Sequence, residues 1–341
     1  MDIEYHYWMT GLIAHRAGFT EEETQTIAYA SQFVDENDVC MEIMDKARPK
    51  EAPYTNFISQ TMNILKPKDN LLRIYPIFHF IPGQPDAITA RRRDGKMHLL
   101  NTTPNNENAN RFIDEAFKAH EDTRLYRIGI ATHCYVDTWA HQNFVGWYDN
   151  FNDIGFDPKP NIGHADAEHH PDWMSHIWID SRLVEAEVNN KHRFLSASEH
   201  VYAKYCSYLK DLGREDRSER WEDLENELET MMGATYTGNK CKYEERRTLS
   251  YQKKLPFLKP FDEQDWLDGA IYTKVRGARD SENSIGAMMT LFKDEHYWRE
   301  DVEKEQTHWY RFQEAVKEHE IFGLKVLTPT FQKMGYDLTV V

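Results

Sequence analysis

The sequence has 341 residues, of which 40% are hydrophobic and 29% charged, and this composition is typical of a folded chain rather than a disordered one. Its formal net charge of -16 disfavours stable nucleic-acid binding, because nucleic-acid binders need a basic surface. No apolar run approaches the roughly 20 residues of a transmembrane helix, and the N-terminus lacks the basic and then apolar layout of a secretory signal. We therefore expect a cytoplasmic protein without a transmembrane segment.

Helical signals dominate the first part of the chain. A helix is expected over about 3–16, and a second begins at Thr20, which forms a capping-box pattern with Glu23. The stretch 49–103 predicts irregular structure because it is rich in proline and glycine. Helical periodicity returns near residue 108 and runs to about residue 147, and 149–172 predicts a long loop.

The second half also predicts helices, namely around 180–188, from Ser196, over 218–232, and one or two long helices within 284–322. We therefore expect an all-α, multi-helix bundle. Residues 1–180 would form a metal-binding helical core, and 181–341 would continue the same domain or form a subdomain. Four scattered cysteines show no CxxC or disulfide-type spacing and are expected to be reduced: Cys40, Cys134, Cys206 and Cys241.

The stretch RIGIATHCYVDTWAHQNFVGW, residues 127–147, contains the most informative pattern. His133, Asp137 and His141 recur at intervals of four. In an α-helix each such step advances about 40° around the axis, so the three side chains form one stripe. The surroundings are apolar or aromatic, and a buried face does not normally carry two imidazoles and a carboxylate unless something binds them. The stripe therefore predicts a metal site.

Further ligand-type residues extend this prediction. His164 and Glu168 are again four apart, in NIGHADAEHHPDW, and histidine with carboxylate is a ligand set that serves zinc. Adding His6, Asp35 and His79 gives eight candidates, which is enough for two or three ions that share a bridging carboxylate.

In this order, the motifs resemble those of the zinc-dependent phospholipase C and fungal single-strand nuclease superfamily. The resemblance covers roughly residues 1–180. The matching motifs are His6 in EYHYWM, Asp35 in FVDEN, His79 in IFHFIPG, His133 and Asp137 in HCYVD, then His141, and His164 and Glu168 in HADAE.

The resemblance implies an all-helical fold with a trinuclear zinc cluster. One metal would be held by Asp35, His79, His133 and Asp137, a second by His141, His164 and Glu168, and a third by His6 with Asp137 shared. The implied activity is hydrolysis of a phosphoric ester by a metal-bound hydroxide. We assign Asp35 and Asp137 as the catalytic carboxylates, with Asp166 as the alternative to Asp35 for orienting the water. The expected substrate is a small phosphoester or phospholipid-like molecule; other divalent metals could replace zinc.

The sequence departs from the superfamily at two places. His141 follows the HxxxD aspartate by four residues rather than six, without the Gln-Pro pair. In secreted members a processed N-terminal residue ligates the third metal through its amine. Here either Asp2 takes that role or the third site is missing.

Several of these ligand positions have competing candidates in the sequence. His15 competes with His6, and Asp38 with Asp35. Pro171 limits any helix that carries HxxxE, so other residues of the loop could replace the chosen ligands, namely Asp166, His169, His170 and Asp172. His98, His192 and His319 are expected at the surface. The competing non-enzymatic hypothesis is a helical protein whose metals are structural.

Overall fold

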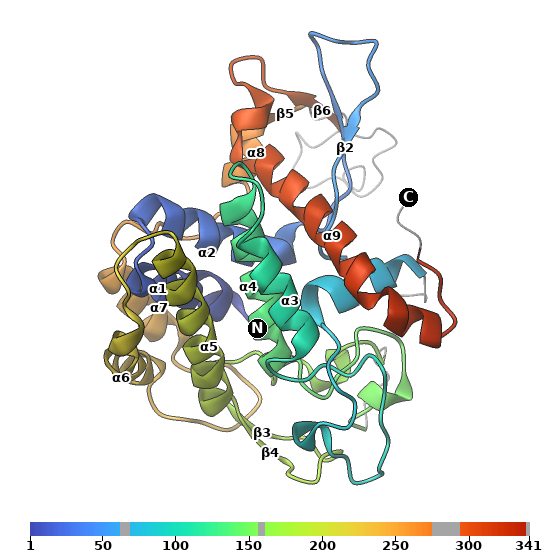
Figure 1. Ribbon diagram of the computed structural model, residues 1–341, viewed down its shortest axis with the longest axis vertical. Helices are drawn as coiled ribbons and strands as arrows, with labels where there is room; N and C mark the ends of the chain where they lie inside the picture. Colours follow the sequence, from blue (N-terminus) through green and yellow to red (C-terminus); the bar gives the residue numbers. More distant parts are fainter. Residues whose placement is uncertain (62–68, 156–160, 275–293, 339–341) are drawn as a thin grey trace, which may run out of the picture.

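The computed structural model describes residues 1–61, 69–155, 161–274 and 294–338 (Figure 1). About 52% of the chain is helical and 10% is in strands, which form a mixed four-stranded sheet and a two-stranded sheet. The protein is therefore an α/β protein, and the all-α expectation is wrong. The strands are only two to four residues long, and the four-stranded sheet pairs segments far apart in the sequence. Local periodicity therefore does not predict this sheet.

The helices account for most of the ordered backbone. The α-helices are α1 (Thr10–Ala17), α2 (Glu21–Glu36), α3 (Glu107–Ala116), α4 (Arg124–Ala140), α5 (Asn190–Asp211), α6 (Trp221–Met232), α7 (Glu244–Lys254), α8 (Asp265–Ala270) and α9 (His308–Lys333). Within the described ranges, two segments are π-helical, Glu4–Met9 and Tyr75–His79. Short 3-10 turns are Asp69–Arg73, Ile88–Ala90, Asn150–Asn152, Ala165–Ala167, Ser218–Arg220 and Lys304–Gln306.

The four-stranded sheet has the order β2-β1-β6-β5 and lies at the top of Figure 1. Strand β1 (Glu42–Met44) pairs antiparallel with β2 (Tyr54–Thr55) and parallel with β6 (Glu295–Trp298). Strand β6 pairs antiparallel with β5 (Ile271–Lys274). Residues from both ends of the chain thus build one sheet.

The two-stranded sheet consists of β3 (Ile177–Ile179) and β4 (Glu187–Asn189), at the bottom of Figure 1. The stretch 180–188, for which we expected a helix, forms the connection between the two strands and the start of β4, so that expectation is wrong. Asp180 is the physical reason, because its carboxylate accepts hydrogen bonds from the backbone N–H and the guanidinium of Arg182 and so stabilises a turn.

Helix α4 lies at the centre of the fold and packs against α2, α3, α5 and α9. All its residues from Tyr126 to Ala140 are buried, as expected of a helix surrounded by other helices. Gly129 allows α2 to approach closely, since a Cβ at this position would lie 2.6 Å from both Ala30 Cβ and the Ile27 carbonyl oxygen. The stripe of ligand-type residues is therefore inside the protein.

The helix boundaries agree with several local sequence signals. The capping box of Thr20 and Glu23 is present and confirms the predicted start of α2. We predicted one or two long helices within 284–322. Residues 284–293 lie outside the described residues, and Glu295–Trp298 form strand β6 instead of a helix. From His308 onward the region is helical, as part of α9. One hydrophobic core includes residues from α2 and from α9, so both halves of the chain contribute to it. Among the described helices, none combines the length and the apolar character that crossing a membrane requires.

Candidate metal centre

Eight ligand-type residues of the first 172 positions converge on one largely buried site from five parts of the chain. The π-helical segments Glu4–Met9 and Tyr75–His79 each contribute a histidine, which agrees with the frequent occurrence of π-helical turns at functional sites. The last turn of α2 contributes a carboxylate, and α4 contributes two side chains. The chain that follows α4 contributes three more. The converging residues are His6, Asp35, His79, His133, Asp137, His141, His164 and Asp172.

Within this site the ligand atoms form three groups, each compact enough to surround one ion. The groups are Asp35 with His79 and His133, His6 with His133 and Asp137, and His141 with His164 and Asp172; the ligand atoms of each lie within 4.8 Å of one another.

The first two groups meet at His133. Its Nε2 atom lies 3.7 Å from Asp35 Oδ1, 3.2 Å from Asp137 Oδ2 and 3.1 Å from His79 Nδ1. His6 Nε2 lies 3.2 Å from Asp137 Oδ1, and the His6 ring stacks on that of His133 with centroids 3.8 Å apart. Asp137 therefore contacts both groups through its two oxygens.

The third group centres on Asp172. Its Oδ1 atom lies 3.5 Å from His141 Nε2, and its Oδ2 atom lies 3.4 Å from His164 Nε2. His141 is the first residue after α4, and its Nδ1 atom also lies 3.5 Å from Asp137 Oδ2. This contact brings the third group next to the other two.

Four of the imidazoles are oriented by backbone carbonyls. His79 Nε2 bonds to Ser59 O at 3.0 Å and His133 Nδ1 to Ser31 O at 2.8 Å. His141 Nδ1 bonds to His79 O at 2.7 Å and His164 Nδ1 to Glu168 O at 2.7 Å. Because a carbonyl oxygen only accepts, the ring nitrogen that faces it must carry the hydrogen. In the neutral ring, the other nitrogen then presents a lone pair to the carboxylates.

In this arrangement hydrogen-bond acceptors of the imidazoles face hydrogen-bond acceptors of the carboxylates. The free nitrogens of His79 and His133 face each other and the carboxylates of Asp35 and Asp137, all of which accept when the rings are neutral. Either protons or cations must therefore lie between them. Hydrogen bonding from the second ring nitrogen to a carbonyl is the arrangement usual for histidines that ligate metals.

Buried polar atoms without hydrogen bonds test whether a metal fits. Within the described part of the chain, neither ring nitrogen of His6 makes a hydrogen bond, nor do Asp137 Oδ2 and Asp172 Oδ1. Leaving such atoms unpaired costs about 1–3 kcal/mol each. They belong to the second and third groups, and their nitrogen and oxygen chemistry suits zinc. The residues present therefore fit divalent ions.

The electrostatics of the site favour an ionised Asp137 and a neutral His6, but they favour protonation of His133 when no cation is bound. Burial alone would raise the pKa of Asp137, but the surrounding histidines, His141 first, hold it well below its ordinary value. Burial lowers the pKa of His6 to about 3, and His133 beside it contributes in the same direction. Burial opposes protonation of His133, but the carboxylates of Asp137 and Asp35 outweigh it and raise the pKa.

The beginning of the sequence also reaches the centre. The backbone nitrogen of Met1 lies 2.5 Å from Asp137 Oδ1 and 3.5 Å from Asp172 Oδ1. The side chain of Asp2, which we considered in this role, accepts a hydrogen bond from the Glu4 backbone N–H instead.

Seven of the eight residues predicted from the sequence lie in these groups, and Glu168 does not. Glu168 is exposed, with φ at 53°, and its backbone carbonyl orients His164. Asp172, a competing candidate from the same loop, takes the carboxylate position beside His141 and His164.

The remaining competing candidates lie outside the three groups. His15 packs against Phe257, with ring centroids 5.0 Å apart. Asp166 accepts hydrogen bonds from the backbone N–H groups of Ile154 and Gly155 and so shapes the loop. The groups also do not include Asp38, His169 and His170.

A cavity of about 380 Å³ borders this centre. It is lined by Met1, Asp2, His169, Asp172, Trp173 and Glu244. Asp172 is the member of the three ligand groups that belongs to this lining.

The comparisons with known proteins add a family but no function. A family described as a family of unknown function (DUF6765) matches residues 1–327. Neither the curated proteins nor the solved structures gave a match.

Proposed function

We propose that this chain, which belongs to that family of unknown function, is a metal-dependent hydrolase that cleaves phosphoric esters and holds two or three zinc ions. The ligands would be Asp35, His79 and His133 for one ion, His6, His133 and Asp137 for a second, and His141, His164 and Asp172 for a third. The resemblance to the zinc-dependent phospholipase C and single-strand nuclease superfamily supports the choice of reaction.

One observation carries the proposal. Four backbone carbonyls fix four imidazoles so that their free nitrogens point at buried carboxylates. Burying so many acceptors together is costly unless cations lie among them. Because the side chains come from five separate segments, chance proximity of two neighbouring residues does not account for the arrangement.

Zinc ions in such a cluster lower the pKa of a coordinated water to about 7 and stabilise charge on phosphoryl oxygens. The protein's own residues contribute position and charge. Asp137 contacts two groups at once and would keep two ions close together. Asp35, whose side chain is 27% exposed, is the most accessible carboxylate of the centre and is suited to orient a water molecule.

The cavity beside Asp172 supports a small substrate. Its volume of about 380 Å³ accommodates a small phosphoester or the head group of a phospholipid-like molecule rather than a folded polymer. The net charge of -16 makes positive charge at the centre the main attraction for a phosphate.

The test combines metal analysis with turnover. The purified protein is expected to contain zinc after reconstitution and to hydrolyse a generic diester such as bis-p-nitrophenyl phosphate. Asp35→Asn and Asp137→Asn should lower metal content and turnover together. Asp38→Asn is the matched control, because Asp38 follows the same helix but lies outside the three groups.

Two outcomes would contradict the proposal. A protein that binds no divalent metal after reconstitution would refute the metal centre itself. A protein that binds zinc stoichiometrically but turns over neither monoesters nor diesters would instead favour structural metal sites, in which the ligand positions are filled by the protein.

A further inference from the structure

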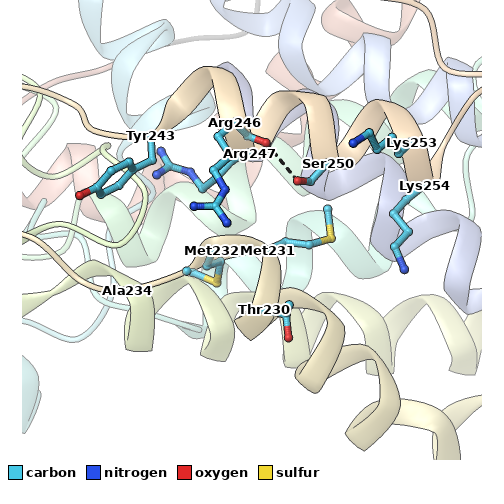
Figure 2. A pocket seen from close by; sticks show the side chains of 11 residues that line it. Thr230, Met231, Met232, Ala234, Tyr243, Arg246, Arg247, Ser250, Lys253 and Lys254 are labelled. Carbon is cyan, nitrogen blue, oxygen red and sulfur yellow. Dashed lines mark hydrogen bonds between the residues drawn. The ribbon is translucent and has the colours of Figure 1, made fainter.

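A second cavity, of about 610 Å³, lies between the C-terminal end of α6 and the side of α7 (Figure 2). Cationic side chains of α7 form one wall, and Met231 and Met232 of α6 form part of the opposite wall. The lining residues differ from those of the cavity beside the metal centre, so this is a separate pocket.

The cationic wall follows from the spacing of residues along α7. Tyr243, Arg246, Arg247, Ser250 and the pair at 253–254 recur at intervals of three and four, which places them on one helix face. A helix face turned toward a neighbouring helix is ordinarily apolar. Here the face carries four positive charges, in a chain whose net charge is -16.

Two of these cations already have carboxylate partners. Arg247 is 3% exposed and donates to Glu4 Oε1 at 2.7 Å, and Lys254 lies 2.8 Å from Glu227 Oε1. The other two, Arg246 and Lys253, are exposed and form no ion pair with any residue that the structure describes. They are therefore available to an anion.

The methionine part of the opposite wall is apolar and adaptable. Met231 is 8% exposed and Met232 is 1% exposed, and methionine side chains adjust readily to different apolar shapes. Tyr243, which also lines the pocket, is 61% exposed and has a φ of 64°, a left-handed conformation that is uncommon for a bulky residue. Strained backbone of this kind concentrates at binding sites.

We propose that this pocket binds a small amphiphilic anion, with its phosphate or carboxylate group between Arg246 and Lys253 and its apolar part against Met231 and Met232. The inference does not depend on the proposed hydrolase function, because no residue of the metal centre lines the pocket. Charge and apolar contact are both required, since either wall alone is ordinary surface.

The experiment measures binding of octyl phosphate, at concentrations where it remains monomeric, to the full-length protein by isothermal titration calorimetry in the presence of a chelator. The chelator removes the metal centre as a competing phosphate site. We expect saturable binding of one molecule per chain. Arg246→Gln/Lys253→Gln should weaken it at least about tenfold, because both charged hydrogen-bond donors to the anion are removed. Lys325→Gln, which removes an exposed charge from α9, is the matched control and should leave binding unchanged.

Octanoate, inorganic phosphate and octyltrimethylammonium complete the design. Octanoate tests whether a carboxylate can replace the phosphate. Binding of octyl phosphate or of octanoate supports the proposal if the double variant weakens that binding. Inorganic phosphate should bind much more weakly than octyl phosphate, and the cationic amphiphile should not bind. Equal binding of inorganic and octyl phosphate would overturn the apolar half of the proposal. Binding unaffected by the double variant, or no binding at all, would overturn the whole.

Discussion

The close approach of α2 and α4 at Gly129 predicts that a larger residue at this position lowers both the stability of the protein and its metal content. In Gly129→Ala the new Cβ would lie 2.6 Å from Ala30 Cβ and 2.6 Å from the Ile27 carbonyl oxygen. Carbon atoms in ordinary contact are about 3.5–4.0 Å apart, so the two helices must separate by about 1 Å. Neither obstacle is the mobile end of a side chain, so local rearrangement cannot relieve the contact.

The expected loss of stability combines two opposing effects. Overpacking of this kind costs about 1–3 kcal/mol, whereas exchanging glycine for alanine inside a helix gains about 1 kcal/mol. With a mid-range overpacking cost of about 2 kcal/mol, the net expectation is a decrease of about 1 kcal/mol in the free energy of unfolding. His133 lies one turn beyond Gly129, and its Nδ1–H bonds to Ser31 O at 2.8 Å, so separating the helices also moves a predicted ligand.

The assay is urea denaturation of the chelator-treated protein, followed by metal analysis of the reconstituted protein. Chelation keeps metal binding from contributing to the measured stability. Gly269→Ala is the matched control, because no atom lies within 4 Å of its new Cβ, and it should be as stable as the wild type or more so. If Gly129→Ala unfolds at the wild-type urea concentration and binds as much metal, the reasoning from helix packing is refuted.

Three other changes probe the loop, the buried ion pair and a core histidine. Asp172→Asn should lower the metal content, and Glu168→Gln, an exposed carboxylate of the same loop, should not; equal losses would contradict the grouping. Arg247→Met leaves the buried carboxylate of Glu4 without its partner and should lower the free energy of unfolding, measured with urea, by about 3–5 kcal/mol. Adding Glu4→Gln removes the unpaired charge and should recover much of this loss; no recovery would show that the ion pair does not cause it. Burial holds the pKa of His319 well below its ordinary value of 6.5, so the unfolded chain takes up the proton first and stability falls as the pH decreases below about 6.5. His319→Gln should flatten that part of a plot of urea midpoint against pH, and an unchanged slope would show that other groups cause it.

The stripe on α4 was predictable because it depends only on local helix geometry. His133 and Asp137 lie on one buried face, as their spacing of four indicates. His6, Asp35 and His79 required the resemblance, because no spacing rule relates residues on separate segments. The structure brings all of these side chains together.

The same spacing rule predicted Glu168 as the loop carboxylate, whereas the structure has Asp172 at that position of the site. His164 and Glu168 would share a face only on a helix, but just the short turn Ala165–Ala167 forms between them, and the φ of 53° at Glu168 turns the chain away. Asp172 could not be singled out, since its position depends on that turn. His319 is another case, because its expected surface position is wrong: it is fully buried within α9, with Nε2 3.4 Å from Cys134 Sγ.

The parallel pairing of β1 with β6 has a consequence for how the chain folds. Ile43 pairs with His296, so this sheet can form only after most of the chain has been synthesised, whereas the candidate metal ligands all lie within the first 172 residues. Closing such a long loop is slow, because its entropy is lost before the strand contacts form. We expect a folding intermediate in which the centre is largely assembled while β1 still exposes an unpaired edge to other chains. Metal supplied during synthesis would then stabilise the intermediate and reduce aggregation before the sheet closes.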